Sequence, residues 1–325
     1  MHQILVAGVA GFIGSKVAEL FLAQGYHIIG VDNLNDAYDV RLKHWRLQRL
    51  LNHPQFTFRV TDVKDAVAID ELGRTLPKVQ AVFNLAACAG VRHSVEHPKI
   101  FFDTNTCGTL NLLELCRRKG VKKFVLASTS SLYNHTAGLP FHEALDTSHP
   151  LSPYAASKKA AEVLSYTYHY LYKLDVTILR YFTVYGPAGR PDMSPFRFVQ
   201  WVSEGRPVTI YGDGQQLRDF TYVDDIARGT LATLAIPGYE VINLGSNRPI
   251  KLLDALSIIE KKVGRPAKIV FKDAHAADIP ATWADITLAN RLLGWLPQVD
   301  FETGIERTVA WYQAEQTWAR SVSTD

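Results

Sequence analysis

The stretch QILVAGVAGFIG, residues 3–14, decides the fold. Apolar residues occupy positions 4–7, glycines follow at 8, 11 and 14, and an apolar pattern with a spacing of three to four residues begins there. A strand that enters a glycine-rich turn and then a helix is typical of a dinucleotide-binding unit. The glycines allow a tight turn and a close approach to a pyrophosphate, which the helix N-terminus attracts.

An acidic residue lies at the distance that this unit requires. Asp32 ends the second predicted strand, eighteen residues after Gly14. Its carboxylate can accept both hydroxyls of an adenine ribose and would repel a 2′-phosphate, so the sequence favours NAD over NADP. Asp62 follows the third predicted strand, where it either reaches the adenine or caps a helix.

Short β-prone runs alternate with helical patterns over about the first 180 residues. Most runs are continuously apolar, as in parallel strands buried on both faces. We expect strands at 3–7, 27–31, 56–60, 79–85, 124–127 and 176–181, and helices at 13–23 and 104–118. This alternation predicts an α/β fold with a Rossmann-type doubly wound parallel sheet.

The pattern changes after Gly186, where prolines interrupt it. A strand-like piece at 240–244 precedes helices at 252–263, 289–293 and 304–320. We expect a dinucleotide-binding domain at 1–184, to which 221–244 returns, and a smaller C-terminal α/β substrate-binding domain at 185–220 and 245–325.

Composition limits the class of protein. The 325 residues are 47% hydrophobic and 21% charged, with a net charge of +3, which excludes a disordered chain and a polyanion-binding excess. Three cysteines without a CxxC pair fit a reducing compartment. We find no apolar run of about 20 residues and no signal-peptide pattern, and expect a cytoplasmic protein that binds neither nucleic acid nor membrane. Histidines 53, 93, 97 and 149 show no metal-ligand spacing, so we expect no metal.

A second group of residues predicts catalysis. Ser128, Thr129, Ser130 and Ser131 follow the fifth predicted strand, and Tyr154 and Lys158 stand four apart in YAASK. A spacing of four places the phenol and the ammonium on one helix face. The positive charge is expected to lower the tyrosine pKa, and such a tyrosine can act as a base on a substrate hydroxyl.

These motifs together resemble the extended short-chain dehydrogenase/reductase superfamily. The stretches NDAYDVRLKHWRLQRL, NLAACAGVRHSVEHP, LRYFTVYGPAGRPDM, RDFTYVDDIARG and DIPATWAD look, more specifically, like those of UDP-glucuronate 4-epimerases. The resemblance implies that Tyr154 takes the proton of the sugar 4-hydroxyl while C4 delivers hydride to tightly held NAD. It also implies that Thr129, with Ser128 in the same hydroxyl cluster, assists the tyrosine and that Lys158 holds the nicotinamide ribose.

The resemblance further implies the binding residues. Those expected for NAD are Gly8, Gly11, Phe12, Ile13, Gly14, Asp32, Asn33, Asp62, Val63, Leu85, Ala86, Ala87, Asn105, Tyr154, Lys158 and Tyr181. Those expected for the substrate are Ser130, Ser131, Thr183, Arg190, Phe196, Thr209, Tyr211, Arg218 and Asp278. Phe196 is alternatively a core aromatic, and Arg218 alternatively a surface ion pair with Asp219 or Asp213.

The sequence departs from the family pattern in three places, and several alternative activities remain open. Asn134 and His135 stand where relatives carry glycine, His275 replaces an arginine of galactose-type epimerases, and Thr183 replaces their asparagine. Decarboxylases and 4,6-dehydratases of the superfamily carry an acid in the segment that reads STSS here, so both are disfavoured. The open alternatives are a UDP-glucose or UDP-N-acetylhexosamine 4-epimerase, a UDP-glucuronate decarboxylase and a dinucleotide-sensing regulator. The helices near 99–119 and 154–174 are expected to form a homodimer.

Overall fold

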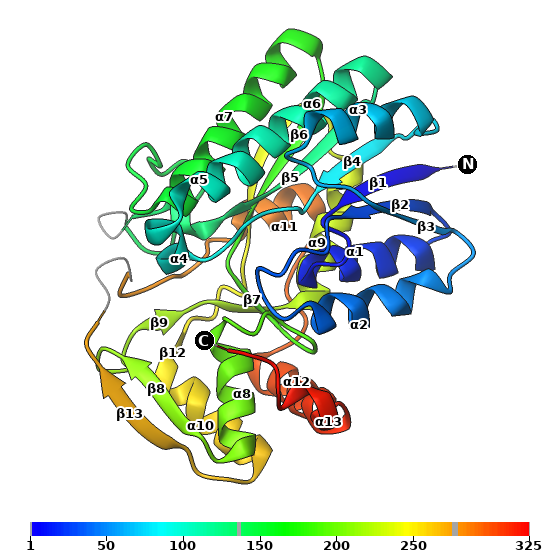
Figure 1. The fold of residues 1–325 in the computed structure, drawn as a ribbon. Helices are drawn as coiled ribbons and strands as arrows, with labels where there is room; N and C mark the ends of the chain where they lie inside the picture. Colours follow the sequence, from blue (N-terminus) through cyan, green and yellow to red (C-terminus); the bar gives the residue numbers. More distant parts are fainter. Residues whose placement is uncertain (1, 135–137, 275–278, 325) are drawn as a thin grey trace.

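The computed structural model describes residues 2–134, 138–274 and 279–324. Its centre is a seven-stranded parallel sheet in the order β11-β6-β5-β4-β1-β2-β3 (Figure 1). The strands are β1 (Gln3–Ala7), β2 (His27–Asp32), β3 (Phe56–Val60), β4 (Ala81–Asn84), β5 (Lys123–Thr129), β6 (Asp175–Tyr181) and β11 (Tyr239–Leu244). The predicted Rossmann-type α/β fold is confirmed.

The chain reverses its direction of winding between β1 and β4. Strands β2 and β3 extend the sheet from β1 to one side, and β4, β5 and β6 extend it to the other. In a sheet wound this way, the carboxyl ends of the two central strands open a crevice in which ligands bind. The end of β1 therefore positions the site.

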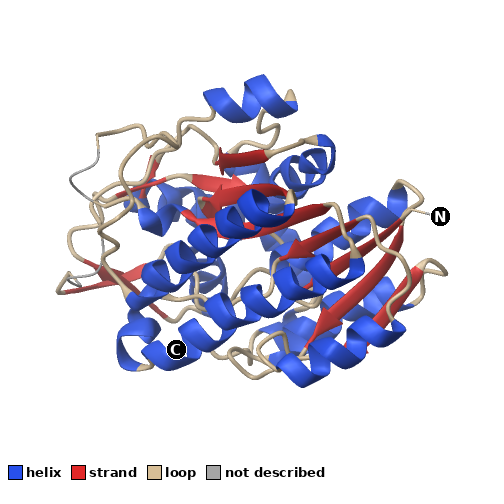
Figure 2. Ribbon diagram, turned by 90° about the horizontal axis from the view of Figure 1, so that it is seen from above, coloured by secondary structure: helices blue, strands red, loops and turns tan. Residues whose placement is uncertain are grey.

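Helices cover both faces of the sheet (Figures 1 and 2). One face carries α1 (Phe12–Ala23), α2 (Val40–Leu51), α9 (Val223–Ala232) and α11 (Thr287–Leu293), and the other carries α3 (Ala66–Thr75), α6 (Gly108–Lys119) and α7 (Pro153–Tyr172). A separate apolar core fills each interface. The inner strands are buried on both faces, which explains their mostly apolar sequences, whereas the edge strands β3 and β11 are partly exposed.

The helix α7 is 20 residues long and begins at a well-formed cap. The Ser152 hydroxyl accepts a hydrogen bond of 3.2 Å from the Ala155 backbone N–H, and Pro153 takes the first helical position. Lys173, at the other end, adopts a left-handed φ of 55° and ends the helix. Tyr154 thus lies in the first turn and Lys158 in the second.

A second layer of structure lies below the central sheet (Figure 1). It contains α8 (Ser194–Glu204), α10 (Leu252–Val263), α12 (Phe301–Ala314), α13 (Gln316–Ala319), the parallel pair β8 (Pro207–Tyr211) and β13 (Lys268–Lys272), and the antiparallel pair β9 (Leu217–Arg218) and β12 (Ile250–Lys251). Its apolar core includes Trp201, Trp311 and Tyr312. The parallel strands β7 (Thr183–Tyr185) and β10 (Phe220–Tyr222) connect it to the sheet.

The structure corrects three predicted boundaries. The segment 104–118 begins as the π-helix η1 (Phe102–Cys107) before α6, and 304–320 is broken between α12 and α13. The segment 245–325 is not wholly a second domain, because Ala284, Ile286 and Trp295 belong to the core beneath the sheet. These apolar residues follow a long segment that belongs to the second layer. No local sequence pattern shows whether they pack in the core of that layer or in the core of the sheet.

Short elements complete the described chain. They are α4 (Val91–Glu96), α5 (Pro98–Phe101), and the 3-10 helices η2 (Ser130–Leu132) and η3 (Thr233–Ala235). Within the three described ranges, no helix combines the length and the apolar character needed to cross a membrane.

Candidate active site

A cavity of about 900 Å³ opens at the carboxyl ends of the central strands. It continues from the glycine turn past η2 to strands β8 and β9, and so joins the sheet to the second layer. The predicted site residues that line it are Gly8, Gly11, Asp32, Asn33, Asp62, Val63, Leu85, Ala86, Ala87, Ser130, Ser131, Thr183, Arg190, Thr209, Tyr211 and Arg218. One cavity therefore contains residues of both the predicted cofactor group and the predicted substrate group.

The glycine turn leaves no room for side chains. Gly8 has a φ of +78°, and a Cβ there would lie 2.6 Å from the Ala86 backbone nitrogen. A Cβ on Gly14 would lie 2.1 Å from the Gly8 oxygen. Gly11 precedes α1 and supplies no side-chain cap, so the backbone N–H groups of the first turn, at Phe12 and Ile13, remain for an anion. Phe12, Ile13 and Gly14 are not among the residues that line the cavity.

Asp32 is held by the backbone around the glycine turn. One carboxylate oxygen accepts a hydrogen bond of 3.2 Å from the Ala10 N–H, and the other accepts one of 2.9 Å from the Leu34 N–H. The Lys43 ammonium lies 3.7 Å from the second oxygen and donates a hydrogen bond of 2.7 Å to Asn35. Lys43 also lines the cavity, and sequence reasoning missed it because a charged residue in a helix ordinarily faces solvent.

The structure argues against one of the two interpretations of Asp62, the helix cap. The cap of α3 is Asp65, whose carboxylate accepts hydrogen bonds from the N–H groups of Val67 and Ala68. Asp62 instead accepts a hydrogen bond of 3.0 Å from the Asn33 amide and lines the cavity. The ends of β2 and β3 are thereby joined beside Asp32. A glycine turn without side chains, an uncapped helix end and two carboxylates along one cavity fit a dinucleotide.

Tyr154 lies beside Thr129, and Lys158 lies behind it. Burial is the largest effect on the phenol and raises the Tyr154 pKa, while the neighbouring Thr129 hydroxyl and the Arg190 charge act in the opposite direction. Lys158 does not produce the expected lowering of the tyrosine pKa. Its ammonium donates a hydrogen bond of 2.7 Å to the Ala127 oxygen, and burial lowers the pKa of Lys158 to about 8.

The hydroxyl cluster divides into two groups. Ser128 donates a hydrogen bond of 2.6 Å to Glu162, whose carboxylate is also bound by the Arg180 guanidinium at 2.9 and 3.1 Å. Ser128 is therefore part of a buried network, and like Thr129, Tyr154 and Lys158 it is not among the residues that line the cavity. Thr129 also accepts a hydrogen bond of 3.1 Å from the backbone N–H of Ser131 and so begins η2, which presents Ser130 and Ser131 to the cavity.

Arg190 brings a cation to the same part of the cavity. Its guanidinium donates a hydrogen bond of 2.9 Å to the Ala89 oxygen and forms a bidentate ion pair with Asp192 at 3.0 and 2.5 Å. Phe101 also lines the cavity, and its ring lies 6.1 Å from the Tyr154 ring in an edge-on arrangement. The tyrosine is thus enclosed by Thr129, an arginine and an aromatic ring.

The far end of the cavity is aromatic and basic. The Arg92 guanidinium lies 3.9 Å from the Tyr211 ring centre, and Arg218 lines the same region from β9. Asp219 is buried and accepts hydrogen bonds from the N–H groups of Ser246, Asn247 and Ala284. It therefore organises a turn and is not the ion-pair partner considered for Arg218. Sequence reasoning missed Arg92, whose helix α4 is only six residues long.

Three further residues that were predicted to bind substrate or cofactor, Phe196, Asn105 and Tyr181, do not line the cavity. Phe196 is a core residue whose ring lies 6.0 Å from that of Trp311, and Phe198, two positions on, lines the cavity instead.

The two other residues are held by internal bonds. The Asn105 amide is bound to both backbone groups of Cys88 and to the Ser157 hydroxyl, all within 2.9 Å. The Tyr181 hydroxyl bonds Thr230 at 2.8 Å. Neither of these side chains lines the cavity. Asp278, His275 and His135 lie outside the described residues.

Comparison with known proteins identifies the group to which this site belongs. Residues 4–245 match the NAD dependent epimerase/dehydratase family. A UDP-glucuronate 4-epimerase of Thermodesulfobacterium geofontis is 54% identical over 312 residues, which are 96% of each chain.

Solved structures show the same relationship. The crystal structure of UDP-glucuronic acid 4-epimerase from Bacillus cereus, in complex with UDP-glucuronic acid and NAD, is 37% identical with a TM-score of 0.90 and covers 96% of this chain and 99% of its own. A UDP-glucose 4-epimerase of Thermotoga maritima with UDP-glucose is 32% identical with a TM-score of 0.88, covering 97% and 99%. This chain belongs to the NAD dependent epimerase/dehydratase family.

Proposed function

We propose that the protein is an NAD-dependent UDP-glucuronate 4-epimerase that interconverts UDP-glucuronate and UDP-galacturonate. The observation that carries the proposal is the 54% identity, over 96% of both chains, with an enzyme of that name. The site supports it, because Tyr154 lies beside Thr129 and Arg190, and Arg190, Ser130 and Ser131 line the cavity that also holds predicted cofactor residues.

Tyr154 exchanges the proton of the sugar 4-hydroxyl. NAD, when bound, accepts the C4 hydride and later returns it to the opposite face of the 4-keto sugar. Thr129 donates to or accepts from the phenol and keeps its oxygen in place. Lys158, anchored on Ala127, keeps a cation behind the tyrosine and close to where the nicotinamide ribose would lie.

The substrate carboxylate requires control, because the 4-keto intermediate is a β-keto acid that can lose CO₂. Loss is easiest when the bond from C5 to the carboxylate lies perpendicular to the ketone plane. Ser130, Ser131 and Thr183 offer hydroxyls in the cavity, and Arg190 offers a cation held by Asp192. We assign the hydroxyls to the carboxylate and leave Arg190 to close over the substrate.

The uridine diphosphate occupies the far end of the cavity. Thr209 and Tyr211 on β8 hold the uracil, and Arg218 on β9 meets the diphosphate. Asp278 is proposed to bind the ribose. The Arg92 guanidinium over the Tyr211 ring adds a second cation near this end.

We also propose a homodimer built from η1, α6 and α7. These adjacent helices expose large apolar side chains to water in a single chain. The exposed side chains, with their exposed fractions, are Phe102 (38%), Leu110 (37%), Val163 (56%), Tyr166 (51%), Tyr170 (64%) and Leu171 (56%). Apolar side chains gathered on neighbouring helices favour a contact with a second copy. The free thiols of Cys88, Cys107 and Cys116 support a cytoplasmic location, where thiols stay reduced.

The test is to mix purified protein with UDP-glucuronate, without added NAD, and to follow the products by proton NMR. UDP-galacturonate is the expected product and would show that NAD co-purifies. UDP-pentose would instead identify a decarboxylase. Turnover of neutral UDP-hexoses alone would identify another 4-epimerase, and no turnover of any UDP-sugar with NAD supplied would favour the regulator.

A further inference from the structure

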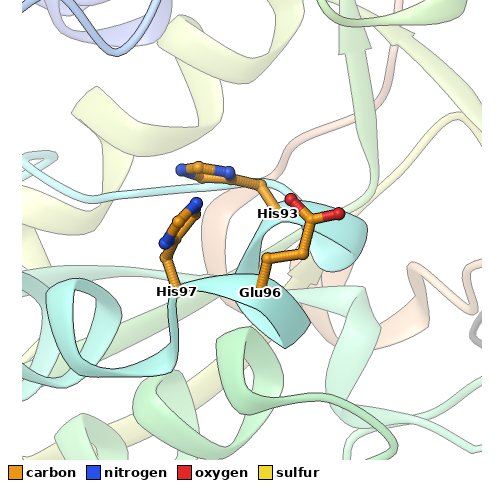
Figure 3. A group of neighbouring side chains, drawn as sticks. All are labelled: His93, Glu96 and His97. Atoms are coloured by element: carbon orange, nitrogen blue, oxygen red, sulfur yellow. The ribbon is translucent and has the colours of Figure 1, made fainter.

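Three metal-ligating side chains lie together at the short helix α4: His93 and Glu96 within it, and His97 directly after its last residue (Figure 3). One ligand atom each from His93, Glu96 and His97 lies within 4.8 Å of the others. The sequence HSVEH contains both histidines one helical turn apart, with the carboxylate between them. This spacing corrects our expectation that the histidines have no metal-ligand arrangement.

The backbone explains why the three groups meet. Positions 93 and 96 fall on one face of α4, since residues three apart are neighbours, and His97 follows directly as the C-cap residue. The two imidazole rings lie 4.7 Å apart, and the His93 ring also packs 5.8 Å from the Phe101 ring. The spacing becomes visible only when residues 91–96 are known to be helical, because the pattern is too short to predict a helix.

The side chains have freedom to close around an ion. All three are exposed, and in the part of the chain that the structure describes none of them forms a side-chain hydrogen bond or ion pair. Ligand atoms about 2.1 Å from a tetrahedral ion lie about 3.4 Å from one another. Binding an ion would shorten the present separations of up to 4.8 Å to that value through rotation of the three exposed side chains.

The donor set selects the kind of ion. Imidazole nitrogens suit Zn²⁺, Cu²⁺ and Ni²⁺, whereas Mg²⁺ and Ca²⁺ prefer oxygen ligands. The single carboxylate compensates part of the charge. The neighbouring cation Arg92 lies over the Tyr211 ring.

We propose that His93, Glu96 and His97 bind one divalent transition-metal ion, with Zn²⁺ as the reference ion. Two of its three ligands, His93 and Glu96, line the cavity, so the ion stands at the cavity edge. Three protein ligands leave one position of a tetrahedral ion for water or for an oxygen of a molecule in the cavity. The site lies outside the Tyr154 and Lys158 pair and goes beyond the proposed epimerase.

The test is isothermal titration of tag-free full-length protein, with its cofactor bound, with Zn²⁺ alone. We expect one ion per chain in the wild type. His97→Ala and the nearly isosteric Glu96→Gln should each weaken binding by about tenfold or more, since loss of even an outer partner of a metal site has an effect of that size. Circular dichroism of both variants checks that they fold.

His149→Ala is the matched control, because His149 is also exposed and lies 3.5 Å from a carboxylate of Asp146. It should bind Zn²⁺ as the wild type does. The proposal is overturned if the wild type shows no saturable binding, if His97→Ala and Glu96→Gln bind as tightly as the wild type, or if His149→Ala loses the ion. Because the readout is binding, failure of the epimerase assignment would leave this result unaffected.

Discussion

The Lys158 ammonium is hydrogen-bonded, at 2.7 Å, to the backbone oxygen of Ala127. This bond ties the second turn of α7 to the carboxyl end of β5, only two residues before Thr129. Tyr154, one helical turn earlier, is thereby held against the Thr129 hydroxyl. The lysine thus positions the tyrosine by anchoring helix α7 to strand β5.

Tyr154→Phe removes the proposed base and keeps the ring. We expect kcat to fall by about 10²–10⁴-fold, the usual contribution of a positioned acid or base, with bound NAD retained. Product formation by NMR and the dinucleotide content of the purified protein measure both effects. Tyr170→Phe, an exposed tyrosine on the same helix, is the control; activity of Tyr154→Phe equal to that of the control would refute the mechanism.

Arg218→Ala should raise KM for UDP-glucuronate by about tenfold or more, because a hydrogen bond to a charged group contributes about 1.5–3 kcal/mol. Steady-state kinetics over a range of substrate concentrations measures it. Arg248→Ala removes an exposed arginine that does not line the cavity and should leave KM unchanged. An unaltered KM in Arg218→Ala would mean that the diphosphate lies elsewhere.

Gly14→Ala should prevent NAD retention, because its Cβ would lie 2.1 Å from the Gly8 oxygen and displace the turn. The ultraviolet spectrum of the purified protein, before and after denaturation, reports the dinucleotide. Gly138→Ala is the matched control, since a Cβ there meets nothing within 4 Å. Full cofactor content in Gly14→Ala would show that the turn does not bind the pyrophosphate.

The buried side chain of Lys123 should make the free energy of unfolding depend on pH. Burial lowers its pKa from 10.5 to about 8, although Asp175 and Glu240 act in the opposite direction. Between these values the unfolded lysine holds a proton that the folded one has lost, so the folded state gains stability as the pH rises. Below about pH 8 the buried lysine is charged, and the full cost of burying that charge reduces the free energy of unfolding. Above about pH 10.5 the lysine is neutral in both states and the cost has disappeared.

Lys123→Met removes this titration. From pH 7.5 to 10 the unfolding free energy of the wild type should therefore rise, relative to the variant, by up to about 3 kcal/mol. Urea unfolding at several pH values measures the difference. Lys122→Met, at the exposed neighbouring position, should show no such trend. A constant difference between wild type and Lys123→Met would contradict the lowered pKa.

The proposed homodimer is tested at Val163, in the middle of α7, which is 56% exposed. Val163→Glu places a charge on the proposed interface and should convert the dimer to a monomer, because burying an unpaired carboxylate is unfavourable. Sedimentation at several concentrations measures the mass. Val60→Glu, on strand β3 and 69% exposed, should remain dimeric; equal masses for both variants would reject this interface.

The fold was predictable because its signals are local. A buried strand, a glycine turn and a helix follow one another within residues 3–23, and each needs only its neighbours to form. The ends of parallel strands meet at one edge of the sheet, so the predicted positions of Asp32, Asp62 and the hydroxyl cluster also converged.

The errors lie where contacts between distant segments decide. Ser128 and Thr129 are adjacent hydroxyl residues at the end of β5. The Ser128 hydroxyl donates a hydrogen bond to Glu162, whereas the Thr129 hydroxyl lies beside the Tyr154 phenol. Phe196 and Phe198 lie on one helix and both are buried in the core of the second layer, yet only Phe198 also lines the cavity, which decides the alternative left open for Phe196. Neither distinction has a signal within a short window of sequence.

The sequence by itself determined the doubly wound sheet, the glycine turn and the helical spacing of Tyr154 and Lys158, because backbone sterics and apolar periodicity act over a few residues. Only the tertiary structure decided which hydroxyl meets the tyrosine, where Lys43 and Arg92 point, and that burial outweighs the charges around the tyrosine. Those outcomes depend on which side chains exclude water from one another. That is a property of the packed molecule as a whole.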